Sequence, residues 1–232
     1  MGSVFSPAAV AAFELLFRPW MRRRVHAVRV AGLPTRIPPA QPLLLAANHA
    51  TWWDGFVLRE VQRMLRPGAP LYTVMSAAEL DRFPFFRRLG VVGIDAGSPA
   101  SVARAVRFLE ARIRDRPDSV VAYFPQGRIW PTHRRPLDFR RGVEIFARRL
   151  GAVVLPVGLH AEPLNTVSPT FFVSVGEPLD GAPEAAELER HVEAQLDAIH
   201  RFLAEHGEDA PRLWPGPFEP LEATRDPVRG AR

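Results

Sequence analysis

The sequence of 232 residues contains no cysteine and no lysine, and each absence excludes a class of chemistry. Without cysteine there is no disulfide framework, no thiol nucleophile and no cysteine-based zinc site. Without lysine there is no Schiff-base residue and no lysine-dependent phosphate-binding loop. Histidines and carboxylates are present, but no grouping of them has the spacing of metal ligands, so we expect no metal and no resident cofactor.

Long hydrophobic runs are also missing. The most apolar stretch near the start, residues 4–13, is ended by Glu14, far short of the ~20 residues that a membrane-spanning helix needs. No basic segment precedes it, as one would in a secretory signal, so we expect a cytoplasmic protein.

The first 30 residues nevertheless resemble a helix that lies in a membrane interface. Apolar residues, Trp20 and an arginine cluster at residues 22–24 occur together, a combination typical of interfacial amphipathic helices. We therefore expect residues 1–30 to form a helical segment that associates peripherally with the inner face of the membrane. A helix that caps the protein core is the alternative, and the two roles are compatible.

Positive charge is concentrated in one part of the chain. Residues 1–150 hold 24 arginines and 11 acidic residues, whereas residues 151–232 hold 6 arginines and 14 acidic residues. A basic region indicates an anionic partner. The arginines are scattered through predicted helices without a known reader motif, so we expect no nucleic-acid partner. Arg134, Arg135, Arg140 and Arg141 are candidates for binding the phosphates of coenzyme A, with a solvated basic face as the simpler interpretation.

Apolar and amphipathic segments alternate along the rest of the chain. Short apolar runs predict strands at residues 43–46, 71–74, 91–94, 119–124, 153–160 and 170–175, and helical spacing predicts helices at 55–65, from 99 onward, 142–150 and 184–205. This alternation predicts an α/β domain over residues 31–206, with a mixed, mostly parallel sheet flanked by helices. Residues 207–232 form a proline-rich tail.

A histidine and an aspartate follow the first predicted core strand. The apolar run at residues 43–47 leads into NHATWWD at residues 48–54, which places His49 and Asp54 five positions apart. In α/β sheets, ligands bind beyond the carboxyl ends of the strands. If a helix begins near residue 51, the carboxylate can orient the imidazole, and the other ring nitrogen is left to accept a proton from a hydroxyl.

Two later segments extend this pattern. One predicted strand ends in FPQGR at residues 124–128, and another runs into Pro156. With residues 48–54, they resemble the motifs of the glycerolipid acyltransferase family, the lysophosphatidate- and glycerol-3-phosphate-type acyltransferases. That family's first motif reads Asn-His-x-Ser-x-x-Asp, its third reads Phe-Pro-Glu-Gly-Thr-Arg, and its fourth is an apolar strand that runs into proline. The resemblance covers roughly residues 40–160.

The resemblance implies transfer of a fatty acyl group from acyl-CoA or acyl-carrier protein to a hydroxyl of a lipid acceptor, with no acyl-enzyme. The absence of a Gly-x-Ser-x-Gly elbow agrees with direct transfer. By resemblance, His49 is the general base, Asp54 orients it, and the backbone at Gly127 is a candidate donor to the tetrahedral oxyanion. The resemblance assigns substrate binding to Asn48, Thr51, Phe124, Pro125, Gln126, Gly127, Arg128 and Pro156.

Several positions depart from the family pattern. Thr51 replaces a serine, Gln126 replaces the glutamate, Ile129 stands where the third motif ends in arginine, and Ala96 follows Asp95 where the second motif has arginine. The resemblance implies that those two arginines hold the acceptor's phosphate. Arg87, Arg88, Arg104 and Arg128 are candidates to replace them, although their spacing does not show it. We therefore expect an acceptor without phosphate, such as a glycolipid or a carotenoid glycoside. The same departures support the alternative of a non-catalytic lipid-binding protein with this fold.

Two groups of aromatic residues have two interpretations each. Trp52 and Trp53 lie between His49 and Asp54, where core packing is the simpler interpretation and an acyl-chain groove is the alternative. A second group, at residues 83–86, precedes two arginines and fits either insertion into a membrane interface or packing against the core.

Overall fold

A computed structural model describes residues 6–164 and 166–206 of the chain. The tail predicted at residues 207–232 lies outside them. In chain order the elements are α1 (Pro7–Arg22), β1 (Ala27–Gly32), β2 (Leu43–Ala47), α2 (Asp54–Leu65), β3 (Leu71–Ser76), α3 (Ala77–Arg82), the 3-10 helix η1 (Pro84–Leu89), β4 (Val91–Ile94), α4 (Pro99–Asp115), β5 (Val120–Tyr123), α5 (Gly142–Leu150), β6 (Val153–Glu162), β7 (Thr170–Val175) and α6 (Ala185–His206).

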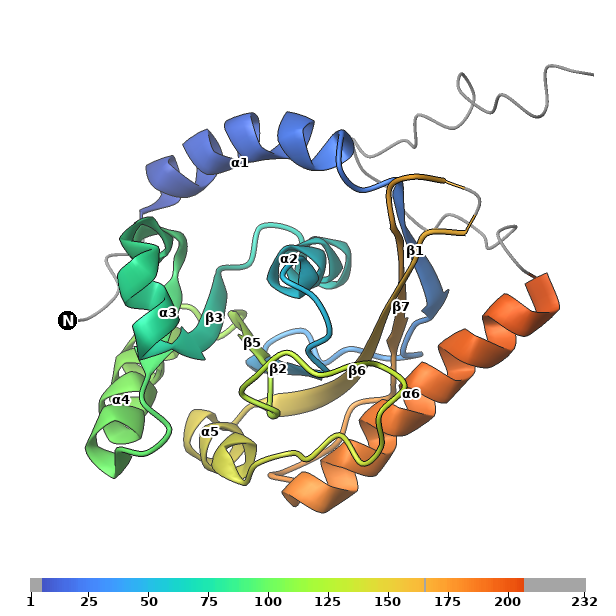
Figure 1. Cartoon of the computed structure of the whole chain (residues 1–232). Coiled ribbons are helices and arrows are strands. Elements are labelled where there is room, and N and C mark those ends of the chain that lie inside the picture. The colour runs from blue at the N-terminus through green and yellow to red at the C-terminus, as the bar shows by residue number, and fades with distance from the viewer. Residues whose placement is uncertain (1–5, 165, 207–232) are drawn as a thin grey trace, which may run out of the picture.

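The seven strands form one sheet in the order β1-β7-β6-β2-β5-β3-β4, so β2 is central (Figure 1). Strands β6, β2, β5, β3 and β4 are mutually parallel. Strand β7 is antiparallel to β6, and β1 is parallel to β7. The predicted mixed, mostly parallel α/β sheet flanked by helices is confirmed.

The two faces of the sheet carry separate apolar layers. All five residues of β2 are buried, as is usual for a parallel strand covered on both sides. Leu43 and Leu45 face the layer that includes α2 and the end of α1, whereas Leu44 faces the layer formed with α4, α5 and α6. Figure 1 shows α1 and α2 on one side of the sheet and α5 and α6 on the other.

The predicted elements match the structure closely except at β1, which was not predicted as a strand, and between β3 and β4. Strands at residues 91–94 and 170–175 and the helix at 142–150 have the predicted bounds, and Ser98 caps α4 by accepting a hydrogen bond from the Ser101 amide. Helices α3 and η1 were missed because each has only six residues, too few to show an amphipathic period. The boundary predicted at residue 30 falls inside β1, which pairs with β7.

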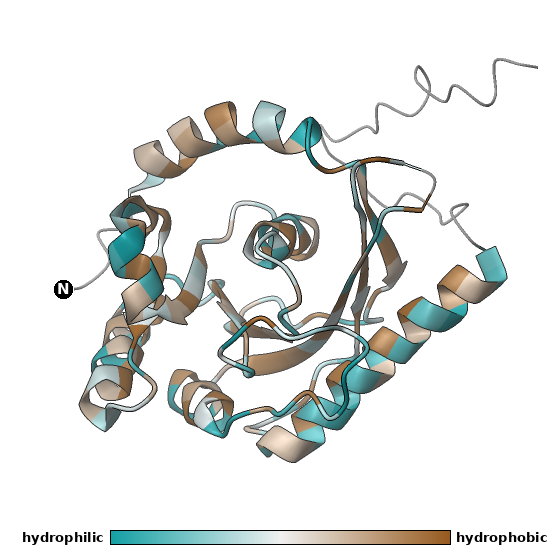
Figure 2. Cartoon of the chain, viewed as in Figure 1, coloured by the Kyte–Doolittle hydropathy of each residue, from teal (hydrophilic) through white to brown (hydrophobic). Residues whose placement is uncertain are grey.

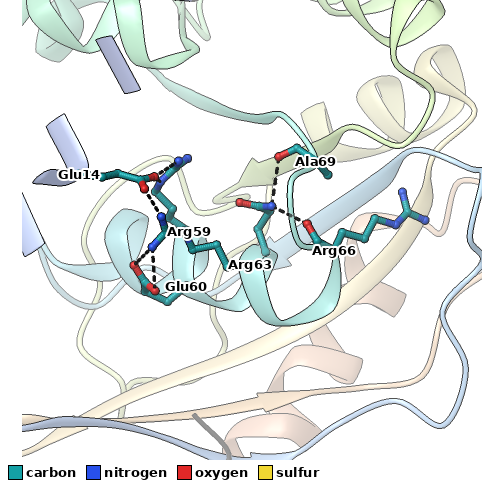
Figure 3. A network of polar contacts seen from close by, with 7 residues as sticks. Glu14, Arg59, Glu60, Arg63, Arg66 and Ala69 are labelled. Carbon is teal, nitrogen blue, oxygen red and sulfur yellow. Dashed lines mark hydrogen bonds and ion pairs between the residues drawn. The ribbon is translucent and has the colours of Figure 1, made fainter. Parts of the chain in front are cut away.

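Helix α1 is a single helix that is joined to α2 by charged side chains (Figure 3). The Glu14 carboxylate accepts hydrogen bonds from Arg59, whose Nε lies 2.8 Å away, and from Arg63. Arg63 also lies 3.3 Å from the carboxylate of Glu60. Burial raises the pKa of Glu60, and the positive charge of Arg63 opposes that rise. The ion pairs therefore hold α1 against α2 through polar groups that point into the protein.

Aromatic rings also join α1 to α2 and to the loop between β2 and α2. Phe17 of α1 stacks on Phe56 of α2 at 4.2 Å between ring centroids, and Trp20 stacks on Trp53 at 5.1 Å. Trp53 is therefore a packing residue, while Trp52 is 49% exposed.

Within residues 6–164 and 166–206, none of the helices combines the length and the apolar character that crossing a bilayer requires.

Candidate active site

His49 and Asp54 lie between the central strand and the helix that follows it. Strand β2 ends at Ala47, and Asp54 is the first residue of α2. The His49 Nδ1 atom lies 2.8 Å from Asp54 Oδ2. The Asp54 side chain is 1% exposed, whereas the His49 side chain is 23% exposed. The imidazole therefore reaches solvent while the acid is enclosed beneath it.

Asp54 is fixed by the loop that it follows. Its Oδ2 atom accepts hydrogen bonds from the amides of Ala50, at 2.6 Å, and Thr51, at 2.8 Å. The Thr51 hydroxyl donates to Oδ1 at 2.7 Å and accepts from the Trp53 amide at 3.1 Å. An ionised carboxylate only accepts hydrogen bonds. With Asp54 ionised, Nδ1 of His49 carries a hydrogen and Nε2 is left as the basic nitrogen.

The loop after β5 holds His49 from the neighbouring strand. Strands β2 and β5 are parallel, with Ala46 level with Tyr123, so the residues that follow them meet at one edge of the sheet. The Gln126 side-chain oxygen accepts a hydrogen bond from the His49 amide at 2.5 Å. The Trp130 amide donates to the His49 carbonyl at 2.7 Å. Gln126 thus accepts the bond with an amide oxygen, without needing the charge of a glutamate.

The imidazole ring also has an aromatic neighbour. Phe124 stacks on His49 with 4.3 Å between ring centroids and 24° between planes. This contact limits rotation of the imidazole. Tyr123, one residue earlier, is buried, and burial raises its pKa to about 12. Tyr123 therefore stays protonated near neutral pH and does not compete with His49 as a base.

The Asn48 side chain, which was expected to contact substrate, is hydrogen-bonded to the backbone of β6. Its side-chain nitrogen donates to the Leu159 carbonyl at 2.9 Å, and its side-chain oxygen accepts from the Leu159 amide at 2.7 Å. Asn48 is 1% exposed. Both polar atoms of its amide are engaged, so Asn48 joins the end of β2 to β6.

Three other residues expected to bind substrate form backbone hydrogen bonds within the protein. Pro125 is buried, and its carbonyl accepts from the Arg140 amide at 3.0 Å. Pro156 is buried within β6, and its carbonyl accepts from the Gly176 amide at 2.9 Å. The expected role of the Gly127 amide as an oxyanion donor is corrected, because this amide donates to the Phe124 carbonyl at 3.0 Å in a turn where Gly127 has φ +65°.

Arg128 lies on the exposed side of the same loop. Its guanidinium is 2.8 Å from the Asp138 carboxylate and lies over the Trp130 ring. Sequence reasoning missed Trp130, because nothing in the spacing of residues 124–130 indicates a bond to His49.

Two hollows on the described surface lie beside Arg149 and beside Gly151, and neither includes His49 or Asp54. Among the described residues, no group of three or more histidines and acids is arranged to hold a metal ion.

Comparison with known proteins agrees with this architecture. A protein-family model described as Acyltransferase matches residues 27–160, a span that contains His49, Asp54, residues 124–128 and Pro156. No curated protein sequence matches the chain. The solved structure of the 1-acyl-sn-glycerophosphate (LPA) acyltransferase PlsC from Thermotoga maritima is similar to this chain, with a TM-score of 0.58 and 19% identity over 84% of this chain and 80% of that one. At this identity the likeness concerns the fold.

Proposed function

The chain belongs to the acyltransferase family whose model covers residues 27–160, and on this basis we propose that it transfers a fatty acyl group from an acyl thioester to a hydroxyl of a lipid acceptor. The observation that carries the proposal is the His49–Asp54 pair, joined at 2.8 Å with the acid buried and the imidazole accessible. In this arrangement His49 is the general base and Asp54 is the residue that orients it.

The reaction proceeds without an enzyme-bound acyl group. The acceptor hydroxyl gives its proton to Nε2 of His49 while its oxygen attacks the thioester carbonyl carbon. The tetrahedral intermediate then expels the thiolate, which takes the proton from the imidazolium. Asp54 stabilises the imidazolium between these two steps, as a carboxylate does in a serine–histidine–aspartate triad. The chain has no cysteine to form an acyl-thioester of its own.

The surrounding bonds keep the base in one orientation. Gln126 and Trp130 hold the His49 backbone at both its amide and its carbonyl. Thr51 fixes the second oxygen of Asp54, so a threonine hydroxyl serves where the family motif has serine. Preorganisation of this kind lowers the free energy needed to align reacting groups. With the Gly127 amide engaged, the amides of Arg128 and Ile129, which have no backbone acceptor among the described residues, are the candidate donors to the oxyanion.

We propose an acceptor without phosphate, with acyl-CoA or acyl-carrier protein as donor. Two positions support this choice. Ile129 is 55% exposed at the place where the third motif of the family ends in arginine. Ala96 is exposed in the turn that leads into α4, where the second motif has arginine. A glycolipid or another hydroxylated lipid would not need a cationic side chain at either position.

The proposed site of action is a membrane surface, with the inner face as the expected side. Leu15 and Leu16 of α1 are each 76% exposed, and Trp20 next to them is also exposed. Arg22, at the end of the same helix, is exposed as well. An apolar helix face bordered by an aromatic residue and cations fits the boundary between headgroups and acyl chains.

The test is release of free thiol from acyl-CoA by purified protein in the presence of a panel of acceptors. His49→Ala is expected to lower kcat by about 10²- to 10⁴-fold, the usual contribution of general-base catalysis. Asp54→Asn is expected to lower kcat with little change in KM. Arg107→Ala, on the exposed side of α4, is the matched control and should leave turnover unchanged.

The panel also separates the rival interpretations. A non-catalytic lipid-binding protein would bind the acceptors but release no thiol, and His49→Ala would then change nothing. Strong and selective turnover of lysophosphatidate would contradict the phosphate-free acceptor while leaving the general-base mechanism in place.

A further inference from the structure

Two arginines share one indole in the loop next to His49. The Cζ atoms of Arg128 and Arg134 each lie 4.1 Å from the centroid of the Trp130 ring. Both distances are well inside the range of about 6 Å within which a guanidinium is attracted to an aromatic face. We refer to Arg128, Trp130 and Arg134 as the arginine–tryptophan platform.

The platform concentrates positive charge that the protein itself neutralises only in part. Arg134 has no acidic partner among the described residues, and the Asp138 carboxylate that pairs with Arg128 is largely exposed. Two guanidinium groups over one ring repel each other, and water screens an exposed pair such as Arg128–Asp138. The indole nitrogen of Trp130 is buried and has no hydrogen-bond acceptor among the described residues. In the part of the protein that the structure describes, the guanidinium groups therefore have too few negatively charged partners, and the indole N–H has no acceptor.

A third arginine borders the same loop. A side chain at Gly127 would come within 3.4 Å of the Arg140 guanidinium, so Arg140 lies directly over this glycine. No acidic partner of Arg140 occurs in the described part of the chain. From residue 128 to residue 141 the sequence contains five arginines and one aspartate. Arg135 pairs with Glu193 and Arg141 pairs with Glu144, so the positive charge that this loop leaves without an acidic partner within the described residues is that of Arg134 and Arg140.

The platform is tied to the reacting residues by the backbone. The Trp130 amide donates to the His49 carbonyl at 2.7 Å, so the residue that carries the two guanidinium groups is bonded to the backbone of the general base. An arginine on an ordinary solvated face has no such connection. The platform therefore belongs to the same loop after β5 that holds the His49 backbone.

We propose that Arg128 and Arg134, held on Trp130, form a binding site for a phosphate group of a substrate. The planar guanidinium is the side chain best matched to phosphate oxygens, since it offers parallel N–H donors with a permanent positive charge. This inference rests on the proposed acyl transfer. Because the proposed acceptor carries no phosphate, the expected source is the acyl donor, whose pantetheine arm ends in phosphate in both acyl-CoA and acyl-carrier protein.

Binding by the full chain can be measured by calorimetry with paired probes that differ in phosphate. Coenzyme A is compared with pantetheine, and lysophosphatidate with monoacylglycerol. In the double variant Arg128→Ala/Arg134→Ala, affinity for coenzyme A is expected to fall at least about tenfold, the loss typical of a charge-assisted hydrogen bond, while pantetheine binding stays the same. Arg107→Ala, which removes an arginine from α4, should not change either affinity.

A variant with the opposite effect makes the assignment sharper. Asp138→Asn removes the carboxylate that competes for Arg128, and asparagine tolerates the positive φ of 63° at this position. Affinity for coenzyme A should then rise about two- to threefold, as expected for loss of one exposed competing ion pair. A surface patch without a ligand would show no response to either change.

The outcomes separate this site from the catalytic proposal. His49→Ala should strongly lower the rate of thiol release but retain coenzyme A affinity, so a failure of catalysis does not affect the binding result. A loss confined to lysophosphatidate in the double variant would keep the phosphate site and assign it to the acceptor. Unchanged affinity of the double variant for both phosphate-bearing probes would overturn the inference.

Discussion

Helices α1 and α6 cover opposite faces of the same sheet (Figure 1), but they differ in which side chains they turn towards the protein. In α6 the buried side chains are apolar, and include Leu188, Val192 and Leu196. In α1 both Glu14 and Phe17 contact α2, whereas Leu15 and Leu16 point to solvent. Figure 2 shows α1 as mostly hydrophobic along its length and α6 as alternating hydrophobic and hydrophilic bands.

The two helices therefore bury different kinds of side chain. An amphipathic helix normally buries its apolar face, as α6 does. Helix α1 buries the apolar Met21, but its inner side also carries the partly buried ion pairs of Glu14 with Arg59 and Arg63, and desolvation of such pairs offsets much of their attraction. Its exposed leucines add nothing to the core. The orientation of α1 is understandable if its outer face contacts lipid, which replaces water next to those leucines.

The largest expected effect is on the α6 side. Leu196→Ala should lower the free energy of unfolding by about 2–5 kcal/mol, the range for a fully buried leucine. Leu16→Ala on α1 should change it by less than about 0.5 kcal/mol, as for other surface substitutions. Urea denaturation of the two variants measures both values, and equal losses would show that the outer face of α1 is buried in solution.

The next largest effect concerns the outer face of α1. Leu15→Ser/Leu16→Ser should weaken binding to anionic vesicles at least about tenfold, because transfer of each leucine into an apolar phase contributes about 1.5–3 kcal/mol. Stability in solution should not change. Sedimentation with vesicles measures the binding, and Ala186→Ser, at an exposed position on α6, is the control. Undiminished vesicle binding by the double variant would mean that another surface contacts the membrane.

A smaller effect is expected at the ion pairs beneath α1. Glu14→Gln leaves Arg59 and Arg63 facing a neutral amide and should lower the free energy of unfolding by about 1–2 kcal/mol, since both guanidinium groups are partly buried. Glu187→Gln, at an exposed position on α6, should change it by less than about 0.5 kcal/mol. Thermal unfolding compares the two, and a neutral Glu14→Gln would show that the pairs set the orientation of α1 without stabilising the fold.

These contrasts also show how far sequence reasoning reached. The strands and most helices were predictable because their periods are local, as in the 91–94 strand and the 142–150 helix. The orientation of α1 was not predictable, because Arg59 and Arg63 lie 45 and 49 residues from Glu14 in the chain. Periodicity identifies two faces of a helix but not which one turns inward when the buried face carries ion pairs.

In the candidate site, too, local features were predictable from the sequence and contacts between distant segments were not. His49 and Asp54 were identifiable because they are close in sequence and follow a strand. The bond from Trp130 to the His49 carbonyl depends on β2 and β5 being neighbours, and the bonds from Asn48 to Leu159 span 111 residues. Such contacts follow from strand order, which the sequence pattern alone left open.

The smallest effect is a difference in pH dependence between the two sides of the sheet. Burial raises the pKa of Glu60 beneath α1 above its usual 4.5, so Glu60 favours the folded state in acid, and this contribution is lost as pH rises through the raised pKa. Burial, and then the nearby charge of His160, lower the pKa of His200 on α6 below its usual 6.5, so the folded state loses stability as pH falls from about 6.5 through the lowered pKa.

Urea denaturation between pH 4 and pH 8 should therefore show Glu60→Gln gaining stability relative to the wild type as pH rises, and His200→Gln gaining as pH falls. The His200 change should be the weaker one because that side chain is largely exposed to screening water. Parallel pH curves for the wild type and both variants would contradict the assignment of opposite signs to the two sides.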